Sequence, residues 1–182
     1  MNIFDATKTP PGMATPETLY QALEQLGIRY SIKQHPSVYT VDEAKKLRGE
    51  ISGAHCKCLF LRNKRGALWL LICLEWRRID TRAFGETLNT GRLSFARPEM
   101  LSATLGIYPG AVTPFSIIND KNTAEQKVRV VLDADMMAAA SVNYHPLVNN
   151  YTINLKPHDL LRFLDFYEHP PIILDFDPLT AK

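Results

Sequence analysis

The chain lacks the sequence features that mark secreted and membrane proteins. Only three of its 182 residues are cysteine, and an odd number of cysteines cannot form a fully paired disulfide framework. The sequence therefore predicts a protein of the reducing cytoplasm. No apolar run approaches the ~18 residues that span a bilayer. The N-terminal residues contain no basic stretch followed by an apolar one, so neither a signal peptide nor a membrane partner is expected.

Two nucleotide-binding motifs and a strong net charge are also missing. The sequence has no phosphate-binding loop with the spacing of glycine, lysine and serine or threonine, and no dinucleotide-binding glycine fingerprint. The net charge of +2 is too small to indicate a nucleic-acid-binding protein by itself. The basic residues gather in three short clusters that are typical of solvated faces, namely Lys45, Lys46 and Arg48, then Arg62, Lys64 and Arg65, then Arg77, Arg78 and Arg82.

What is present is the pattern of one globular α+β domain. Residues 1–14 are predicted to form a loose lead, and residues 15–182 one compact domain whose mixed, mostly antiparallel sheet is wrapped by helices. Short strands dominate the middle of the chain, and strand and helix do not alternate strictly. Helices are predicted over residues 15–26, 40–47, 80–88, 98–105, 133–140 and 157–168, and strands over residues 30–34, 115–118, 128–132, 142–147, 151–155 and 172–176.

A β-hairpin is predicted at the centre of the chain. Two apolar runs, residues 59–61 and 67–74, are joined by a short connection that contains Asn63 and Gly66. Lys57 then lies at the mouth of the first strand, where the backbone can aim its ammonium group into a cleft. The alternative is an ordinary solvated lysine at a strand end, which the pattern alone favours.

The loop over residues 110–114, Gly-Ala-Val-Thr-Pro, is a second candidate feature. Glycine lets the backbone approach a ligand closely, and free backbone N–H groups in such a loop can stabilise a developing oxyanion. His145 and Asn149 add an imidazole and an amide at the end of a predicted strand. Both segments have an alternative interpretation as structural turns that satisfy their own backbone.

Metal and thiol chemistry are two further alternatives. His55, Cys56 and Cys58 are potential metal ligands, but their spacing is cramped and no second cysteine pair completes a tetrahedral site. A cysteine nucleophile paired with His145 is chemically feasible. Cysteines on buried strands are usually inert, which weakens this second alternative.

Nine segments carry a family resemblance when they are taken in order: residues 35–44 (HPSVYTVDEA), 47–57 (LRGEISGAHCK), 59–62 (LFLR), 78–80 (RID), 91–95 (GRLSF), 105–115 (LGIYPGAVTPF), 118–120 (IND), 128–133 (VRVVLD) and 145–147 (HPL). Together they resemble the YbaK-like superfamily of prolyl-tRNA synthetase editing domains. Within it they are most similar to the freestanding ProX (PrdX) branch, the deacylases of alanine mischarged on tRNA(Pro). The resemblance extends from about residue 15 to residue 176.

The resemblance implies an enzyme with the compact editing-domain fold and without a metal or other cofactor. The implied reaction is hydrolysis of the ester between an amino acid and the terminal adenosine of a tRNA, with water as nucleophile and an adenosine hydroxyl assisting. The implied catalytic residues are Lys57, which positions the terminal nucleotide or neutralises charge near the ester, and Gly110, whose loop presents backbone amides to the substrate carbonyl. The implied substrate-binding residues are Tyr39, Val41, Cys58, Ala111, Val112, Thr113, Pro114, His145 and Asn149.

The resemblance also names the partners. The first is a mischarged tRNA, Ala-tRNA(Pro) in the first instance, contacted at its 3′ end and acceptor stem. Prolyl-tRNA synthetase and an elongation factor are further candidates. The alternative function is a non-catalytic module of the same fold that binds tRNA ends or a synthetase.

Two departures from the branch lie beside the expected site. In the first, residues 150–154 (NYTIN) replace the family's threonine- and alanine-rich run after the histidine loop. The second follows Lys57. The residue after the lysine is usually asparagine, whereas this chain has Cys58. If this side chain reaches the cleft, the protein lacks one polar anchor for its substrate. If strand alternation turns it toward the core, an asparagine there would be buried without partners. The sequence leaves both geometries open.

Overall fold

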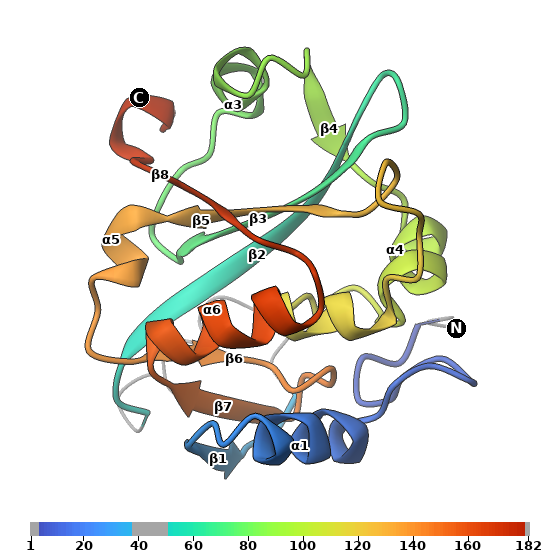
Figure 1. The fold of residues 1–182 in the computed structure, drawn as a ribbon, viewed down its shortest axis with the longest axis vertical. Helices are drawn as coiled ribbons and strands as arrows, with labels where there is room; N and C mark the ends of the chain where they lie inside the picture. The colour runs from blue at the N-terminus through green and yellow to red at the C-terminus, as the bar shows by residue number, and fades with distance from the viewer. Residues whose placement is uncertain (1–3, 38–50, 181–182) are drawn as a thin grey trace.

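The fold is a mixed sheet with helices packed against it (Figure 1). The computed structural model describes residues 4–37 and 51–180. In chain order the elements are α1 (Pro16–Gln25), β1 (Tyr30–Gln34), β2 (Ala54–Asn63), β3 (Leu68–Leu74), α3 (Thr81–Thr87), β4 (Leu93–Phe95), α4 (Pro98–Leu105), the 3-10 helix η1 (Pro114–Asn119), β5 (Arg129–Asp133), α5 (Ala134–Met137), β6 (Val142–Tyr144), β7 (Tyr151–Leu155), α6 (Pro157–Phe166), β8 (Ile172–Leu174) and the 3-10 helix η2 (Asp177–Leu179).

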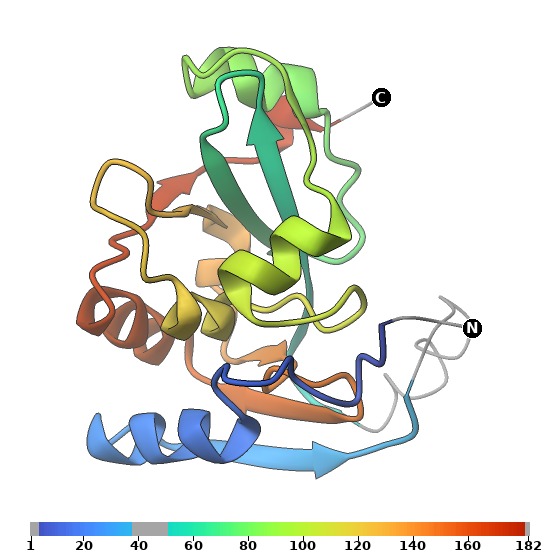
Figure 2. The ribbon, with the colours of Figure 1, turned by 90° about the vertical axis from the view of Figure 1, so that its right-hand side faces the viewer.

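The eight strands form one sheet in the order β1-β7-β6-β2-β3-β5-β8, with β4 paired to β2. The pairs β1–β7, β6–β7, β2–β3 and β2–β4 are antiparallel, and β2–β6, β3–β5 and β5–β8 are parallel. The predicted α+β class, central hairpin and mixed sheet are therefore confirmed. Figures 1 and 2 show α6 between the β3–β5–β8 half of the sheet and the β6–β7–β1 half.

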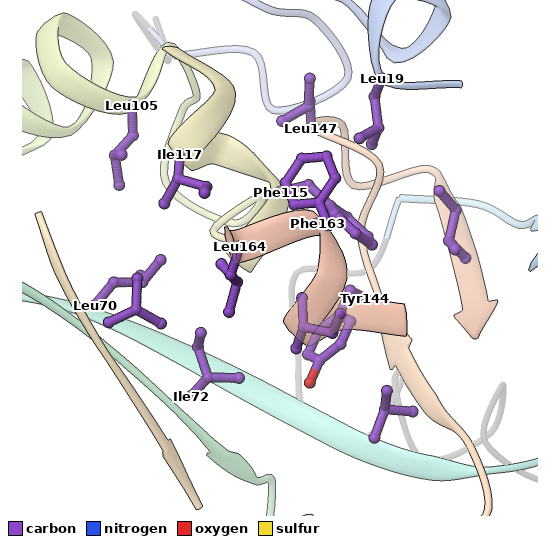
Figure 3. Close-up of a cluster of buried hydrophobic side chains, with 14 of the residues drawn as sticks. Leu19, Leu70, Ile72, Leu105, Phe115, Ile117, Tyr144, Leu147, Phe163 and Leu164 are labelled. Carbon is purple, nitrogen blue, oxygen red and sulfur yellow. The ribbon is translucent and has the colours of Figure 1, made fainter. Parts of the chain in front are cut away.

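Two apolar clusters pack on opposite faces of the central strands. Successive side chains of a strand point to opposite faces, so Leu70 and Ile72 of β3 join the larger cluster, whereas Leu71 joins the smaller one. Figure 3 shows the larger cluster, in which Phe115 of η1 meets Phe163 of α6 with ring centroids 5.1 Å apart. The smaller cluster lies under α3, which contributes Phe84.

Local capping signals set the helix ends as the sequence predicts. The Thr15 side chain accepts a hydrogen bond from the backbone N–H of Thr18 at the start of α1. The Asp80 carboxylate caps α3 in the same way. Helix α4 begins at Pro98 and ends at Gly106, which has a φ of 62°. Among the described residues, no helix is both long and apolar enough to cross a membrane.

Several predicted elements differ from the structure or lie outside it. The helix predicted over residues 133–140 is reduced to α5, Ala134–Met137. Residues 115–118 are predicted as a strand but belong to η1, because Thr113 caps this turn and Pro114 has a fixed φ at its first position. The strand predicted over residues 142–147 stops at Tyr144, since Pro146 and the left-handed Leu147, with a φ of 69°, cannot continue the ladder. The helix predicted over residues 40–47 lies outside the described residues.

A buried contact between a carboxylate and an imidazole attaches the segment after α6 to the segment after η1. The Asp120 carboxylate lies 2.9 Å from Nε2 of His169, with both side chains almost fully buried, and accepts the backbone N–H of Val128 at 2.7 Å. Burial by itself would raise the pKa of Asp120. The hydrogen bonds from His169 and from the amides of Val128 and Asn122 outweigh burial and hold this pKa below its ordinary value.

This depressed pKa predicts an acid-dependent loss of stability. A carboxyl group with a lower pKa in the folded state stabilises the protein above its unfolded pKa of about 3.9, and the contribution is lost as the pH falls through the folded pKa. Asp120→Asn should lower the free energy of unfolding at pH 7 by about 1–3 kcal/mol. Urea unfolding from pH 3 to pH 7 should then show a shallower acid dependence in the variant. An unchanged acid limb would contradict the assignment to Asp120.

Candidate active site

Lys57 lies within β2 and not at its mouth, because the strand begins at Ala54. Its cross-strand partner is Cys73 of β3, which belongs to the smaller apolar cluster, so Lys57 points to that face of the sheet. The side chain is partly buried, and its ammonium group donates a hydrogen bond to the backbone carbonyl of Arg77. The interpretation of Lys57 as a freely solvated lysine is therefore wrong.

The carbonyl that holds Lys57 belongs to a residue fixed by three carboxylates. Arg77 has an exposed fraction of only 1%, which corrects the prediction that it belongs to a solvated cluster. Its guanidinium donates to Asp133 and Asp135, each at 2.6 Å, and also to Asp177. Asp133 is fully buried with it, and a buried arginine needs such partners to offset its desolvation. The network therefore fixes the segment that positions the ammonium group of Lys57.

The loop after α4 contains a tight turn at Gly110. The backbone N–H of Ala111 donates to the carbonyl of Tyr108 at 3.0 Å. Pro109 and Gly110 occupy the two central positions, and the Gly110 φ of 98° is the positive value that a type II turn requires. Among the described residues, the N–H groups of Gly110 and Val112 have no hydrogen-bond partner. These two amides are the candidate oxyanion donors.

The rest of the loop forms a rigid scaffold. Ala111, Thr113 and Pro114 are buried, and Val112 is partly buried. The Thr113 side chain accepts the N–H of Phe115, and its carbonyl accepts the hydroxyl of Ser116 at 2.6 Å. These contacts anchor the glycine turn to η1 and, through η1, to the core.

The connection between β6 and β7 contributes an imidazole and an amide. Nδ1–H of His145 donates to the carbonyl of Tyr151 at 2.9 Å, which leaves Nε2 as a hydrogen-bond acceptor. Burial lowers the pKa of His145, the neighbouring His35 ring adds to this, and the bond to Tyr151 opposes it. The net effect is a lowered pKa, so His145 is neutral at pH 7.

Asn149 meets the glycine turn. Asn149 is only 1% exposed. Neither the oxygen nor the nitrogen of its side-chain amide has a hydrogen-bond partner among the described residues. Its Nδ2 lies 3.6 Å from the position that a Cβ on Gly110 would occupy. A buried amide without partners is costly, so this one is suited to bind a polar ligand. Leu147, in its left-handed conformation, lies between His145 and Asn149 and shapes their connection.

The N-terminal segment before α1 packs against Asn149 and the glycine turn. The backbone N–H of Asn149 donates to the carbonyl of Ala6 at 2.8 Å, and the Ala6 Cβ lies 3.5 Å from the place that a Cβ on Gly110 would take. Phe4 packs on Tyr108 with ring centroids 5.4 Å apart. In Figure 2 the dark blue lead, the loop after α4 and the orange β6–β7 connection come together. Residues 4–6 therefore pack beside the glycine turn and Asn149.

The parallel pairing of β2 and β6 relates the strand of Lys57 to the β6–β7 connection of His145 and Asn149. His55 pairs with Asn143 where the two strands run together. Beyond this pair the two strands separate, because β6 ends at Tyr144 while β2 continues through Lys57 to Asn63. Within the described residues, Lys57 makes no hydrogen bond to His145, Asn149 or the glycine turn. We place the candidate site where β2 and β6 separate, after the pair His55–Asn143, and call this place the fork.

The predicted and the observed site residues differ in four positions. Tyr39 and Val41 lie outside the described residues. His35, from the end of β1, packs its ring 6.1 Å from that of His145 and lies 2.9 Å from the hydroxyl of Thr152. Sequence reasoning does not identify His35 or Arg77 as site residues. The motif His35-Pro36 is the available signal for the first, whereas the sequence contains none for Arg77.

Thiol chemistry is not supported by the surroundings of the cysteines. Burial raises the pKa of Cys56 and of Cys73 to about 12 and that of Cys58 well above its usual value, so the thiols are protonated at neutral pH. Nε2 of His55 donates to the carbonyl of Ile51 at 3.3 Å. Within the described residues, no group of three potential ligands is arranged to hold a metal ion.

The surroundings of Cys58 favour one of its two possible geometries. Its side chain packs against the larger apolar cluster, on the face opposite to Lys57. An asparagine at this position would bury an amide in apolar surroundings. Cys58→Asn should therefore lower the free energy of unfolding by about 1–3 kcal/mol without a faster reaction. A variant that melts like the wild type and reacts a few-fold faster would instead place this side chain in the cleft.

Comparison with known proteins identifies similar chains over nearly the whole length. The family described as the aminoacyl-tRNA editing domain matches residues 35–163. The mouse (Mus musculus) prolyl-tRNA synthetase associated domain-containing protein 1 is 35% identical over 164 residues, which cover 87% of this chain and 95% of that protein. The prolyl-tRNA editing protein ProX of Acetoanaerobium sticklandii is 33% identical over 149 residues, which cover 81% of this chain and 89% of that protein.

The fold is also found among solved structures. A crystal structure described as that of a candidate trans-editing enzyme for prolyl tRNA synthetase superposes with a TM-score of 0.69 at 20% identity. The superposition covers 94% of this chain and 100% of the other.

Proposed function

The chain belongs to the aminoacyl-tRNA editing domain family, and we propose that it hydrolyses the ester bond of mischarged tRNA in trans, with Ala-tRNA(Pro) as substrate. The family gives the substrate class. Relatives named for the prolyl-tRNA synthetase associated domain and for prolyl-tRNA editing support the choice of tRNA(Pro). Such an enzyme would protect the fidelity of translation by removing the wrong amino acid before the ribosome uses it.

The observation that carries the proposal is the set of polar groups at the fork between β2 and β6 that lack partners among the described residues. The N–H groups of Gly110 and Val112 can stabilise the oxyanion that forms when water attacks the ester carbonyl. The buried amide of Asn149 and the Nε2 atom of His145 can hold the amino acid or the ribose. The ammonium group of Lys57 supplies the positive charge near the terminal nucleotide.

In the proposed reaction, a water oxygen bonds to the ester carbon and the bond from that carbon to the ribose oxygen breaks. The proton released by the water passes to the departing ribose oxygen. The products are the free amino acid and a tRNA with both hydroxyls restored. The thiols, with their raised pKa values, are protonated at neutral pH, and burial makes His145 a weaker base than a free imidazole. We therefore assign assistance of the attacking water to an adenosine hydroxyl.

A deacylation assay on a panel of mischarged tRNAs tests the proposal. The full chain should release alanine from tRNA(Pro) faster than it releases proline, and a chelator in the buffer should not change the rate. Faster release of another amino acid would support ester hydrolysis as the reaction but contradict alanine as the amino acid removed. Binding of tRNA without release of any amino acid would favour the alternative, a non-catalytic module for tRNA ends or a synthetase.

A further inference from the structure

A basic groove lies at the far end of β2 from Ala54, next to β4. It has a volume of about 560 Å³. Its lining contains two polar residues, Asn63 and Ser94, and one large aromatic residue, Phe95. The other lining residues are cationic, namely Arg62, Lys64, Arg92 and Arg97. Among the described residues, no carboxylate lines the groove. The sequence places two of these cations in a cluster typical of a solvated face, and it does not group them with Arg92 and Arg97.

The contacts within the fold do not explain the residues of this groove. Among the residues that the structure describes, none of the four cations has an anionic partner. Phe95 is 67% exposed, although its cross-strand partner Leu61 is fully buried. Like charges that converge on one concavity repel each other unless an anion binds between them.

A second basic concavity on the molecule shows the contrast. It has a volume of about 380 Å³ and is lined by residues of β5 and the segment after α6. There, Lys127 pairs with Glu168 at 2.6 Å, and the guanidinium of Arg129 lies 5.1 Å from the ring centroid of Trp69. The cations of that concavity already have internal partners, whereas those of the β2–β4 groove have no anionic partner in the described part of the chain.

Two elements link the groove to the candidate site. Along β2, Arg62 lies about 17 Å from Lys57 at the usual rise of ~3.3 Å per residue. Helix α4 starts at Arg97 and runs toward the Gly110 turn, and its length is about 12 Å. Figure 2 shows β4, α4 and the loop after α4 in succession along one side of the molecule. A ligand that contacts both places must be extended, because these spacings far exceed hydrogen-bond reach, and an RNA strand is long enough.

We propose that the β2–β4 groove binds the phosphate backbone of the acceptor arm of the tRNA whose ester is cleaved at the fork, with Phe95 as a stacking surface for an unpaired base. This inference rests on the proposed function for its substrate. The four cations match the regularly spaced charges of an RNA strand. The exposed ring matches the stacking by which proteins hold unpaired bases. Backbone contacts of this kind fix the register of the RNA and carry little sequence information.

The test separates RNA binding from ester hydrolysis. The probes are an uncharged hairpin with the sequence of the tRNA(Pro) acceptor arm and alanine esterified to adenosine alone. Arg92→Glu combined with Arg97→Glu should raise the Kd for the hairpin by about tenfold or more. The slope of log Kd against log salt should shrink by about 1.4–1.8. Hydrolysis of alanyl-adenosine should stay within twofold of the wild-type rate.

Two further variants keep the test decisive. Phe95→Ala should raise the Kd for the hairpin about five- to hundredfold without changing the salt slope. Arg29→Glu, the same substitution at one exposed arginine beside β1 and so half the charge change of the double variant, should leave the Kd within twofold. Thermal unfolding checks that each variant is folded, and Arg92→Gln with Arg97→Gln replaces the first pair if it is not.

Three results would overturn the inference. They are an unchanged Kd in the groove variants, an equal effect of Arg29→Glu, and an equal loss of alanyl-adenosine hydrolysis. If the wild type hydrolyses no ester at all, the proposed function fails, but binding of the uncharged hairpin still decides the role of the groove.

Discussion

Replacement of Lys57 by methionine is expected to lower single-turnover deacylation by about 10²–10³-fold, the usual effect of removing one electrostatic group from an active site. Methionine keeps the apolar stem that packs beside Cys73 and removes only the charge and its hydrogen bonds. The carbonyl of Arg77 loses one donor in the variant. This loss should cost about 1 kcal/mol of stability, far too little to unfold a domain of this size.

A lysine elsewhere in the fold provides the matched control. Lys127 is also partly buried and also donates to a neighbour, Glu168, but it lies outside the fork. Lys127→Met should keep the wild-type rate, measured as release of alanine from tRNA(Pro) with enzyme in excess. Wild-type activity in Lys57→Met would remove this lysine from the mechanism. An equal loss in both variants would indicate a general effect of charge.

Gly110→Ala is expected to slow the same reaction by about a hundredfold. An alanine at a φ of 98° is strained by roughly 1–2 kcal/mol, which the loop can relieve only by turning its peptide planes. The added Cβ itself would meet Ala6 and Asn149 at 3.5 and 3.6 Å, which are ordinary contact distances. The expected loss therefore comes from misdirected amides, since misplacement by about 1 Å can cost 10²-fold in rate.

Gly66→Ala separates strain from catalysis. Gly66 has a φ of 91° in the β2–β3 turn, and a Cβ there would have no neighbour within 4 Å. The two variants should lose similar amounts of stability in urea unfolding, but only Gly110→Ala should lose activity. A parallel loss of activity in Gly66→Ala would mean that the rate follows stability and does not depend on the orientation of the glycine turn.

Local chemistry makes much of the fold predictable. Caps such as Thr15 and Asp80 define helix starts within a few residues, and the apolar runs that flank Gly66 define the central hairpin. The prediction for the short apolar segment after Thr113 is wrong, because a run of four apolar or small residues fits a strand as well as a buried helical turn. Only the cap and the proline distinguish the two.

The candidate site is predictable as a set of residues but not as an arrangement. The resemblance indicates Lys57, Gly110 and His145, but the parallel pairing of β2 with β6, which relates the strand of Lys57 to the connection of His145, is visible only in the structure. The buried position of Arg77 depends on carboxylates that follow it by 56 to 100 residues. No local pattern indicates such a distant partner, so a run of basic residues is assigned to the surface by default.

The order of the strands also has a consequence for synthesis on the ribosome. Tyr30 of β1 pairs with Leu155 of β7, so the first strand made waits for more than a hundred residues before its partner emerges. At ~5–20 residues per second this delay is roughly 5–25 s. During that time the apolar side of α1, with Leu19 and Leu23, has no completed core to cover it. Nascent chains that do not yet include β7 should therefore depend on chaperones that shield α1.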